Sequence, residues 1–404
     1  MKIVVLKFGG TSVGSIERIK KVCKIITSFI KKRYKVIVVS SAMSGITNDL
    51  IKKSKLISNY FDKSEYDVLV SSGEQMSCSL IAGRLNHLGY NSKSIMGWQI
   101  PILTEGNHSS SRIVNLKKNK IQSFLKRGGI PIVAGFQGIN ADNRITTLGR
   151  GGSDASAIMI AKFFKAKKCI IFTDVEGVYS TDPNIYKNAK KIKIISYEEM
   201  LEMASLGAKV MQPISIQDAR LNRVNINVKS SFVNSSGTLI TKRKNDKSNK
   251  IIKGITFTKN DAKITLVGVR DKPGVAASIF KPLSNNSVNV DMVVQNISSN
   301  KKETDLTFTI KSEDFLKTEK LIKSNLNIKY RNLIFDRNVS KVSIVGVGMI
   351  TTPGVTYRMF QALARKKINI LVISTSEIKI SVLINKKNIK KAIATLHKEF
   401  NLDK

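Results

Sequence analysis

The chain has 404 residues, of which 42% are hydrophobic, so it has enough apolar material for two or three globular domains. Its 68 Lys and Arg against 29 Asp and Glu give a formal charge of +39 at pH 7, which raises nucleic acid or an anionic membrane as a partner. The basic residues are scattered over helical faces and loops, without zinc-finger spacing, an RNP-like aromatic stretch or a basic zipper, so their distribution argues against a nucleic-acid-binding protein.

Three cysteines, Cys23, Cys78 and Cys169, lie in apolar surroundings without CxxC spacing, which favours a reducing compartment. The apolar run at the N-terminus is cut by Lys7 and is too short for a signal-peptide core. No window of 18 apolar residues exists, so we expect no membrane span and a cytoplasmic protein. The three histidines are dispersed, so we expect no metal site built from them.

Residues 5–15, VLKFGGTSVGS, predict a strand, a glycine turn and a helix, because an apolar run precedes them and helical spacing follows over 16–30. Gly9 and Gly10 let the backbone approach a ligand, and their amides with those of the helix's first turn would attract an anion. Lys7 adds a point charge suited to phosphate. The spacing is neither GxxxxGK[ST] nor GxGxxG, so a plain strand-to-helix turn stays open on this loop alone.

Short β-branched runs alternate with helical stretches from residue 1 to 243. This rhythm predicts an α/β catalytic domain with a largely parallel sheet sandwiched by helices. Residues 244–260, which begin with a polar, charged stretch, are the predicted linker. The β-branched runs are KIVVL at 2–6, VIVVS at 36–40, PIVAG at 131–135, CIIFT at 169–173 and INVKSSF at 226–232.

The part after the linker repeats itself at an offset of 80 residues, since Pro273-Gly274-Val275 matches Pro353-Gly354-Val355 and Asn289-Val290 matches Asn369-Ile370. Each copy predicts a strand, a Pro-Gly turn that opens a helix, and a second strand. We therefore expect two βαββαβ modules, at 261–337 and 338–404, that pair their sheets with a neighbour's and bind a small ligand between copies.

Other stretches place polar residues at the ends of strands or the starts of helices. A Ser/Gly/Thr-rich turn carries Ser41 and Thr47, and Glu74 is expected near the start of a helix, whose first turn favours its charge. TTLGRGGSDASA at 146–157 is a second glycine loop that opens a helix, with Arg150 before it and Asp154 in its first turn. Each stretch alone is explained by an ordinary helix cap or turn.

The joint occurrence of these polar stretches in one α/β domain indicates a catalytic site. A third stretch, FTDVEGVYSTDPN at 172–184, adds a polar turn after a strand. Two glycine loops at helix N-termini, with a lysine on one and an aspartate on the other, supply cation clamps, an acidic anchor and helix dipoles. In-line phosphoryl transfer needs these elements.

The successive stretches resemble the signatures of the aspartokinases, in the amino acid kinase family, and the Pro-Gly repeat resembles their paired ACT domains. The resemblance implies ATP-dependent phosphorylation of the side-chain carboxylate of L-aspartate to 4-phospho-L-aspartate, the first step towards lysine, threonine, methionine and isoleucine. The resembling stretches are KFGGTSVG at 7–14, SAMSGITNDL at 41–50, SSGEQMS at 71–77, VAGFQG at 133–138, TTLGRGGSDASA at 146–157, FTDVEGVYSTDP at 172–183 and GAKVMQP at 207–213.

The resemblance also implies roles for single residues. Lys7 would neutralise the transferring phosphoryl group, Asp154 would organise the catalytic centre, and Arg150 would grip the α-carboxylate of L-aspartate. Glu74 would hold the substrate ammonium, with Ser41 and Thr47 on the rest of the amino acid. Mg²⁺ would enter with ATP, held mostly by phosphate oxygens and water, so no protein metal cage is expected. The implied ATP-binding residues are Lys7, Phe8, Gly9, Gly10, Gly151, Gly152, Ser153, Thr173, Asp174, Tyr179, Asp182, Pro183, Lys209 and Val210.

In the repeats the resemblance implies feedback inhibition by L-lysine, L-threonine or both. A helix N-terminus after Pro-Gly would face the effector carboxylate, and a nearby acid its ammonium; a pair of plain turns is the alternative. The implied effector-binding residues are Asp271, Pro273, Gly274, Val275, Ala276, Asn289, Val290, Asp291 and Gln295 in the first repeat, and Thr352, Pro353, Gly354, Asn369, Ile370, Thr375 and Glu377 in the second.

Several alternatives stay open at the level of sequence. One is an amino acid kinase acting on glutamate, acetylglutamate or UMP, and another is a catalytically silent amino-acid sensor. Intact Lys7, Arg150 and Asp154 argue against the sensor. We expect a homo-oligomer through the ACT domains, because an exposed sheet edge invites pairing, and a separately started regulatory chain is a further option.

Overall fold

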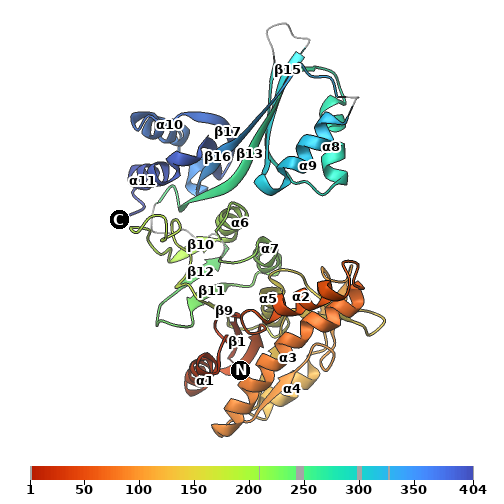
Figure 1. Ribbon diagram of the computed structural model, residues 1–404. Coiled ribbons are helices and arrows are strands. Elements are labelled where there is room, and N and C mark those ends of the chain that lie inside the picture. The colour runs from red at the N-terminus through yellow and green to blue at the C-terminus, as the bar shows by residue number, and fades with distance from the viewer. Residues whose placement is uncertain (1, 209, 243–249, 298–302, 326–327, 404) are drawn as a thin grey trace. The chain divides into compact units, whose positions relative to one another are not determined.

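The structure is a computed structural model that describes residues 2–208, 210–242, 250–297, 303–325 and 328–403 (Figure 1). The chain divides into two compact units. The first holds residues 1–178, 191–205 and 209–247, and the second holds 179–190, 206–208 and 248–404. No helix in the described ranges is long and apolar enough to cross a membrane.

The first unit is built on an eight-stranded sheet in the order β10-β12-β11-β9-β1-β2-β6-β3. All neighbouring strands run parallel except β11 and β12. The predicted α/β domain with a largely parallel sheet is therefore confirmed. The strands are β1 (Ile3–Phe8), β2 (Lys35–Ser40), β3 (Ser92–Ile95), β6 (Ile130–Ala134), β9 (Lys168–Thr173), β10 (Ile194–Ser196), β11 (Ile226–Ser230) and β12 (Thr238–Thr241).

Helices cover both faces of this sheet, and the alternation of side chains along β1 shows how. Val4, Leu6 and Phe8 pack with α1 and α3, whereas Ile3 and Val5 pack with α4 and α5. The helices of the unit are α1 (Ile16–Lys31), α2 (Ile46–Ile57), α3 (Lys63–His87), α4 (Asn119–Lys126), α5 (Gly152–Phe163), α6 (Tyr197–Ser205) and α7 (Pro213–Leu221).

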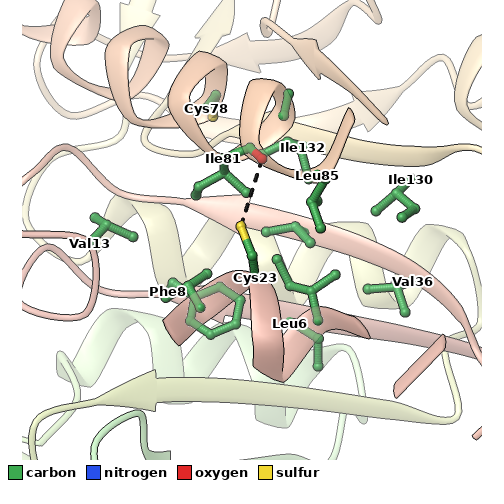
Figure 2. Packing of buried hydrophobic residues seen from close by; sticks show 14 of the residues in the cluster. Leu6, Phe8, Val13, Cys23, Val36, Cys78, Ile81, Leu85, Ile130 and Ile132 are labelled. Carbon is green, nitrogen blue, oxygen red and sulfur yellow. Dashed lines mark hydrogen bonds between the residues drawn. The ribbon is translucent and has the colours of Figure 1, made fainter. Parts of the chain in front are cut away.

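The layer between α1, the sheet and α3 is filled by buried apolar side chains. Figure 2 shows Cys23 of α1 pointing at α3, where its Sγ lies 3.9 Å from the carbonyl oxygen of Ile81. Burial raises the pKa of the Cys23 thiol to about 11, so it stays a neutral core residue. Cys78 and Cys169 are also buried and free, as the sequence predicts.

A small second sheet stands beside the main one, in the order β5-β4-β7-β8. Its strands are β4 (Ile102–Glu105), β5 (Arg112–Leu116), β7 (Gln137–Ile139) and β8 (Ile145–Thr147). The Gln137 side chain joins it to α3 by donating to the Ser71 carbonyl at 3.1 Å. Since β8 leads directly into the second glycine loop, this sheet sets where that loop begins.

The second unit is one six-stranded sheet in the order β14-β15-β13-β16-β18-β17, with antiparallel neighbours. Its strands are β13 (Gly254–Arg270), β14 (Val290–Ile297), β15 (Glu303–Lys311), β16 (Asn332–Val345), β17 (Ile370–Ser376) and β18 (Lys379–Asn385). Its helices are α8 (Val275–Asn285), α9 (Phe315–Lys323), α10 (Val355–Arg365) and α11 (Ile389–Glu399), with short 3₁₀ turns at Ser312–Asp314, Val347–Thr351 and Lys386–Asn388.

The two repeats exchange strand halves inside this sheet. Residues 254–258 of β13 pair with 341–345 of β16, and the register shifts at Asp261 before the two strands continue side by side to Val267. Ile255 accordingly packs in the core of the second repeat, while Leu333 packs against the core of the first. Each repeat is thus completed by a strand segment from the other.

This pairing changes the predicted linker at 244–260. Residues 243–249 lie outside the described part of the chain, and residues 254–260 belong to β13. The polar sequence around Asp261 is a strand with a register shift, because both of its neighbours, β15 and β16, supply backbone partners.

Candidate active site

The site begins at the carboxyl ends of three neighbouring parallel strands. Phe8 at the end of β1 pairs with Ser40 of β2 and Phe172 of β9, and the Phe8 and Phe172 rings stack with centroids 4.8 Å apart. In open parallel sheets, ligands bind beyond such ends. The loops that carry the predicted site residues, after β1, β2 and β9, therefore leave the sheet at one edge.

Lys7 and Asp154 form a mostly buried ion pair at this edge. Lys7 follows Ile3 and Val5 in the alternation of β1, so its side chain lies on the α5 face of the sheet. Its Nζ lies 2.6 Å from Asp154 Oδ1, and the two side chains are 11% and 10% exposed. The structure thus brings together the two residues that the sequence predicts at the catalytic centre.

The second glycine loop places Asp154 by local geometry. Gly151 caps α5 with φ of 80°, and a Cβ on Gly152 would lie 2.8 Å from side-chain carbons of Leu148 and Phe136. The Asp154 amide donates to the Gly151 carbonyl at 2.9 Å, which fixes the first turn. The predicted helix start, with an aspartate in its first turn, is confirmed.

The first glycine loop differs from its predicted form. The Gly9 amide donates to the Phe172 carbonyl at 3.1 Å, so it is already engaged. A Cβ on Gly10 would lie 2.8 Å from the Ala42 carbonyl oxygen, which explains why a glycine is needed there. The helix α1 begins only at Ile16, capped by Ser15, so the glycine pair lies outside its first turn. In the turn after Gly10, the Ser12 and Gly14 amides also donate to backbone carbonyls, those of Gly9 and Thr11, which reduces the backbone donors left for a phosphate.

Glu74 lies in the middle of α3, because that helix begins at Lys63. The expected stabilisation by a helix N-terminus is therefore wrong. Its Oε1 accepts a hydrogen bond from the Ala42 amide at 3.0 Å, while its Oε2 is buried without a hydrogen-bond partner in the described chain. Burial raises the pKa of this carboxyl to about 7, against a lowering contribution from the nearby Lys7 charge.

The other predicted substrate residues come from the loop after β2, the start of α2 and the second glycine loop. Ser41 follows β2, where its amide donates to the Phe8 carbonyl, and its own carbonyl accepts from the Ser77 hydroxyl of α3 at 2.7 Å. Thr47 is half-buried in the first turn of α2. Arg150 is exposed at the start of the second glycine loop. Their contacts with the substrate stay predictions.

The predicted nucleotide residues divide between the two units. Thr173 and Asp174 follow β9 in the first unit, where the Thr173 hydroxyl donates to the Asp174 carboxylate at 3.1 Å. Tyr179, Asp182 and Pro183 belong to the second unit. Val210 is half-buried, and Lys209 lies outside the described residues. The role of this set stays a prediction.

Residues 179–190 are fastened to the second unit in a way that no sequence pattern indicates. The Ser180 carbonyl accepts from the Ile255 amide at 2.7 Å, and the Ser180 hydroxyl lies 2.9 Å from His397 Nε2 on α11. The His397 ring lies 4.5 Å from that of Tyr186, and burial lowers its pKa to about 4. His397 was not among the predicted functional residues.

A cavity of about 370 Å³ lies at the predicted effector site of the first repeat. Gly274, with φ of 89°, caps α8 at its rim. The turn 271–276 and Gln295 line the cavity, together with Ile279 and Leu306. Asn289, Val290 and Asp291 are not among its lining residues. Asp291 instead forms an ion pair with the buried Lys341 of β16.

The predicted residues of the second repeat occupy equivalent positions. Gly354, with φ of 83°, caps α10 after Thr352 and Pro353. Ile370 begins β17 just after Asn369, Thr375 lies near its end, and Glu377 is in the turn to β18. Among the described residues, no group of three or more His, Cys, Asp or Glu could hold a metal ion.

Comparison with known proteins gives the family. The model of the amino acid kinase family matches residues 2–230, and that of the ACT domain matches 264–326 and 342–400. The chain is 45% identical over 406 residues to an aspartokinase of Pseudomonas aeruginosa, covering 100% of this chain and 98% of that one. The chain belongs to the aspartokinase family. An aspartokinase of Geobacillus stearothermophilus is 43% identical over 402 residues, with 100% of this chain and 98% of the relative covered.

Solved structures of aspartokinases share the fold. Escherichia coli aspartokinase III in complex with aspartate and ADP is 25% identical, with a TM-score of 0.78, and the match covers 98% of this chain and 99% of that one. The aspartate kinase of Clostridium acetobutylicum is also 25% identical, with a TM-score of 0.82 and coverage of 98% and 100%. The resemblance drawn from the sequence to aspartokinases with tandem ACT domains is confirmed.

Proposed function

We propose that Lys7, Asp154, Glu74 and Arg150 form the catalytic and substrate-binding centre of an ATP-dependent aspartate kinase. The enzyme phosphorylates the side-chain carboxylate of L-aspartate, giving 4-phospho-L-aspartate. The observation that carries the site assignment is the buried Lys7–Asp154 pair at the strand edge where Glu74 presents a partnerless carboxylate oxygen.

The reaction needs charge compensation more than it needs a base. The side chain of L-aspartate has a pKa of about 3.9, so at neutral pH the nucleophile is already an anion. It must approach a nucleotide that is itself strongly anionic. The Lys7 ammonium offsets this repulsion at the transferring phosphoryl group, and Asp154 holds the ammonium in place from 2.6 Å.

The amino acid is held by groups of opposite charge. The Glu74 carboxylate binds the substrate ammonium through its Oε2, which has no hydrogen-bond partner among the residues that the structure describes. The Arg150 guanidinium binds the α-carboxylate in a planar, bidentate contact. Ser41 and Thr47, on the loop after β2 and the first turn of α2, border the rest of the substrate.

ATP lies over the turn that follows Gly10, with the residues after β9 at its other end. Lys7 supplies the positive charge for its phosphates, and Thr173 and Asp174 offer polar atoms. Mg²⁺ accompanies the nucleotide, and the oxygen donors of Asp154 and Asp174 suit a hard cation that keeps several waters. When bound, this ion neutralises phosphate charge.

The ACT repeats carry feedback inhibition by L-lysine, L-threonine or both. The cavity at the N-terminus of α8 provides backbone amides for an effector carboxylate and the Asp271 carboxylate for its ammonium. We further propose that the enzyme acts in the cytoplasm as a homo-oligomer joined through its ACT sheets, at the first step towards lysine, threonine and methionine.

A comparison of acceptors tests the proposed function. With Mg-ATP, the chain should release ADP with L-aspartate and not with L-glutamate, acetylglutamate or UMP. ADP release that depends on one of those other acceptors would assign a different amino acid kinase, and folded protein that binds nucleotide without turnover would assign a silent sensor.

A further inference from the structure

Asp67 is a fully buried carboxylate on α3 that accepts five hydrogen bonds. Its Oδ2 accepts from His108 Nδ1 at 2.8 Å, and from the amides of Ser109 and Thr147 at 3.0 Å each. Its Oδ1 accepts from the hydroxyls of Ser109 and Thr147. A buried carboxylate is tolerated only when hydrogen bonds or charges compensate it. These five donors therefore stabilise the Asp67 carboxylate in its ionised form.

The five donors come from two segments far from Asp67 in the chain. His108 and Ser109 lie in the loop between β4 and β5, and Thr147 is the last residue of β8. The same two segments are joined directly, because the Ser111 amide donates to the Thr147 carbonyl at 3.0 Å. Asp67 therefore fastens the loop and the strand end together onto α3.

The strand end leads straight into the predicted carboxylate-binding loop. Arg150 follows Thr147 by three residues. Gly149 between them has φ of 71°, and a Cβ there would lie 3.1 Å from the Ser109 carbonyl oxygen, so the loop rests on the segment that Asp67 anchors. The first part of the arginine loop thus has little freedom while the Asp67 bonds are intact.

The helix links the same anchor to the predicted ammonium-binding residue. Glu74 follows Asp67 by seven residues on α3, which is two helical turns, so both side chains lie on one face. A continuous helix between them is rigid on this scale. Asp67 consequently connects the groups expected at the two ends of the substrate backbone, Glu74 and Arg150.

We propose that Asp67 is a positioning residue that sets the spacing between Glu74 and Arg150 and thereby the affinity for L-aspartate. This inference rests on the proposed substrate roles of those two residues. Asp67 does not touch the substrate. It acts by holding the end of β8 against α3. On the nucleotide side, Gly10 lies in the separate loop after β1, and Asp154 is held by the glycine cap of α5 and by its ion pair with Lys7.

The test is Asp67→Asn in the full-length protein, with steady-state constants for both substrates and a thermal melting curve. Asn keeps the shape of the side chain and loses its charge. With the NH₂ group at the Oδ1 position, the two hydroxyls accept instead of donating, and the three donors at Oδ2 bind a neutral amide oxygen, which is a weaker acceptor than a carboxylate. We expect KM for L-aspartate to rise at least about tenfold while KM for ATP stays within about twofold, the pattern of one weakened substrate site.

A second variant covers the case in which Asp67→Asn does not fold. His108→Ala removes a single donor whose side chain is 24% exposed, and it should raise KM for L-aspartate by about threefold with the same selectivity. The matched control is Asp62→Ala. Asp62 caps the same helix from the exposed side by accepting from the amides of Ser64 and Glu65, so its loss should lower the melting temperature and leave both KM values unchanged.

The outcomes separate this inference from the proposed function. If the folded Asp67→Asn variant shows an equal rise in KM for both substrates, or no rise in either, the positioning role is wrong. Turnover of L-aspartate by the wild type would still support the proposed kinase. Glu74→Gln and Arg150→Lys are measured in parallel. If neither raises KM for L-aspartate, the assigned substrate site itself is wrong.

Discussion

Lys7 at the end of β1 and Asp154 in the first turn of α5 are 147 residues apart in the chain, yet Lys7 Nζ lies 2.6 Å from Asp154 Oδ1. Two independent local features of the chain place these two side chains. The strand alternation sends Lys7 to the α5 face, and the glycine cap of α5 sets Asp154 at the helix start. Because both side chains are about nine-tenths buried, neither charge is compensated by water alone.

The first prediction concerns this pair. Asp154→Asn should lower kcat by about a hundredfold or more, because the Lys7 ammonium loses the partner that orients it towards the phosphoryl group. The double variant with Lys7→Met and Asp154→Asn should have nearly the same kcat as Lys7→Met alone, because the two residues act as one unit. Initial rates of ADP release measure this, with the exposed Lys20→Met as a control. Additive losses would show that the two residues act separately.

The second prediction concerns the stability cost of Glu74. Burial raises its pKa to about 7 from an ordinary 4.5, so folding favours the protonated form. The raised pKa therefore lowers the free energy of unfolding. This loss is absent below pH 4.5, grows as the pH rises, and is complete above about pH 7. Glu74→Gln should therefore stabilise the substrate-free protein at pH 8 by up to about 3 kcal/mol and by nothing at pH 4.5. Denaturant unfolding at both pH values measures the difference.

The same substitution should impair substrate binding, because an amide cannot neutralise an ammonium. In the wild type, KM for L-aspartate should rise as the pH falls through about 7, where Glu74 becomes protonated. In Glu74→Gln this dependence should disappear at a uniformly high KM. A variant with unaltered KM and an unaltered pH profile would remove Glu74 from the substrate site.

The third prediction concerns Arg150. Arg150→Ala should raise KM for L-aspartate by about ten- to a hundredfold, the value of a charge-assisted bond to a carboxylate. Because Arg150 is exposed, the free energy of unfolding should stay within about 0.5 kcal/mol of the wild type. Arg127→Ala, an exposed arginine at the end of α4, is the matched control. A selective change in KM for ATP would place Arg150 on the nucleotide instead.

The fourth prediction concerns the effector cavity. Ala276 lines it on the first turn of α8, so Ala276→Trp should fill part of its 370 Å³ and raise the inhibitor concentration for half-inhibition at least about tenfold. Ala277, the next residue of the helix, is exposed and does not line the cavity. Ala277→Trp should keep the wild-type response. Inhibition curves with lysine and threonine measure both, and equal behaviour of the two variants would place the effector elsewhere.

The sequence predicts the parallel sheet and brings Lys7 and Asp154 into one candidate site because these depend on local patterns. Alternation and β-branched runs mark β1, β2 and β9, and a glycine loop before an apolar helix marks the position of Asp154. The sequence around Glu74 gives the wrong start for its helix, because the helix begins at Lys63, eleven residues before Glu74, where Asp62 caps it.

Features that depend on distant partners cannot be predicted in this way. The donors to Asp67 are 41 to 80 residues away, so nothing around it indicates a buried anchor. Residues 254–258 fall in the predicted linker because a charged stretch precedes them, yet they form a strand because 341–345 lie beside them. The segment 179–190 follows a catalytic strand in the chain and packs with His397 at the opposite end of the sequence.

The most direct test of the account is aspartate-dependent acyl phosphate formation with Mg-ATP, trapped as the hydroxamate, in the wild type and in Lys7→Met. The account predicts hydroxamate from the wild type, none above background from the folded Lys7→Met variant, and less product when lysine, threonine or both are added. Wild-type protein that is folded and binds ATP but yields no hydroxamate from L-aspartate would contradict it.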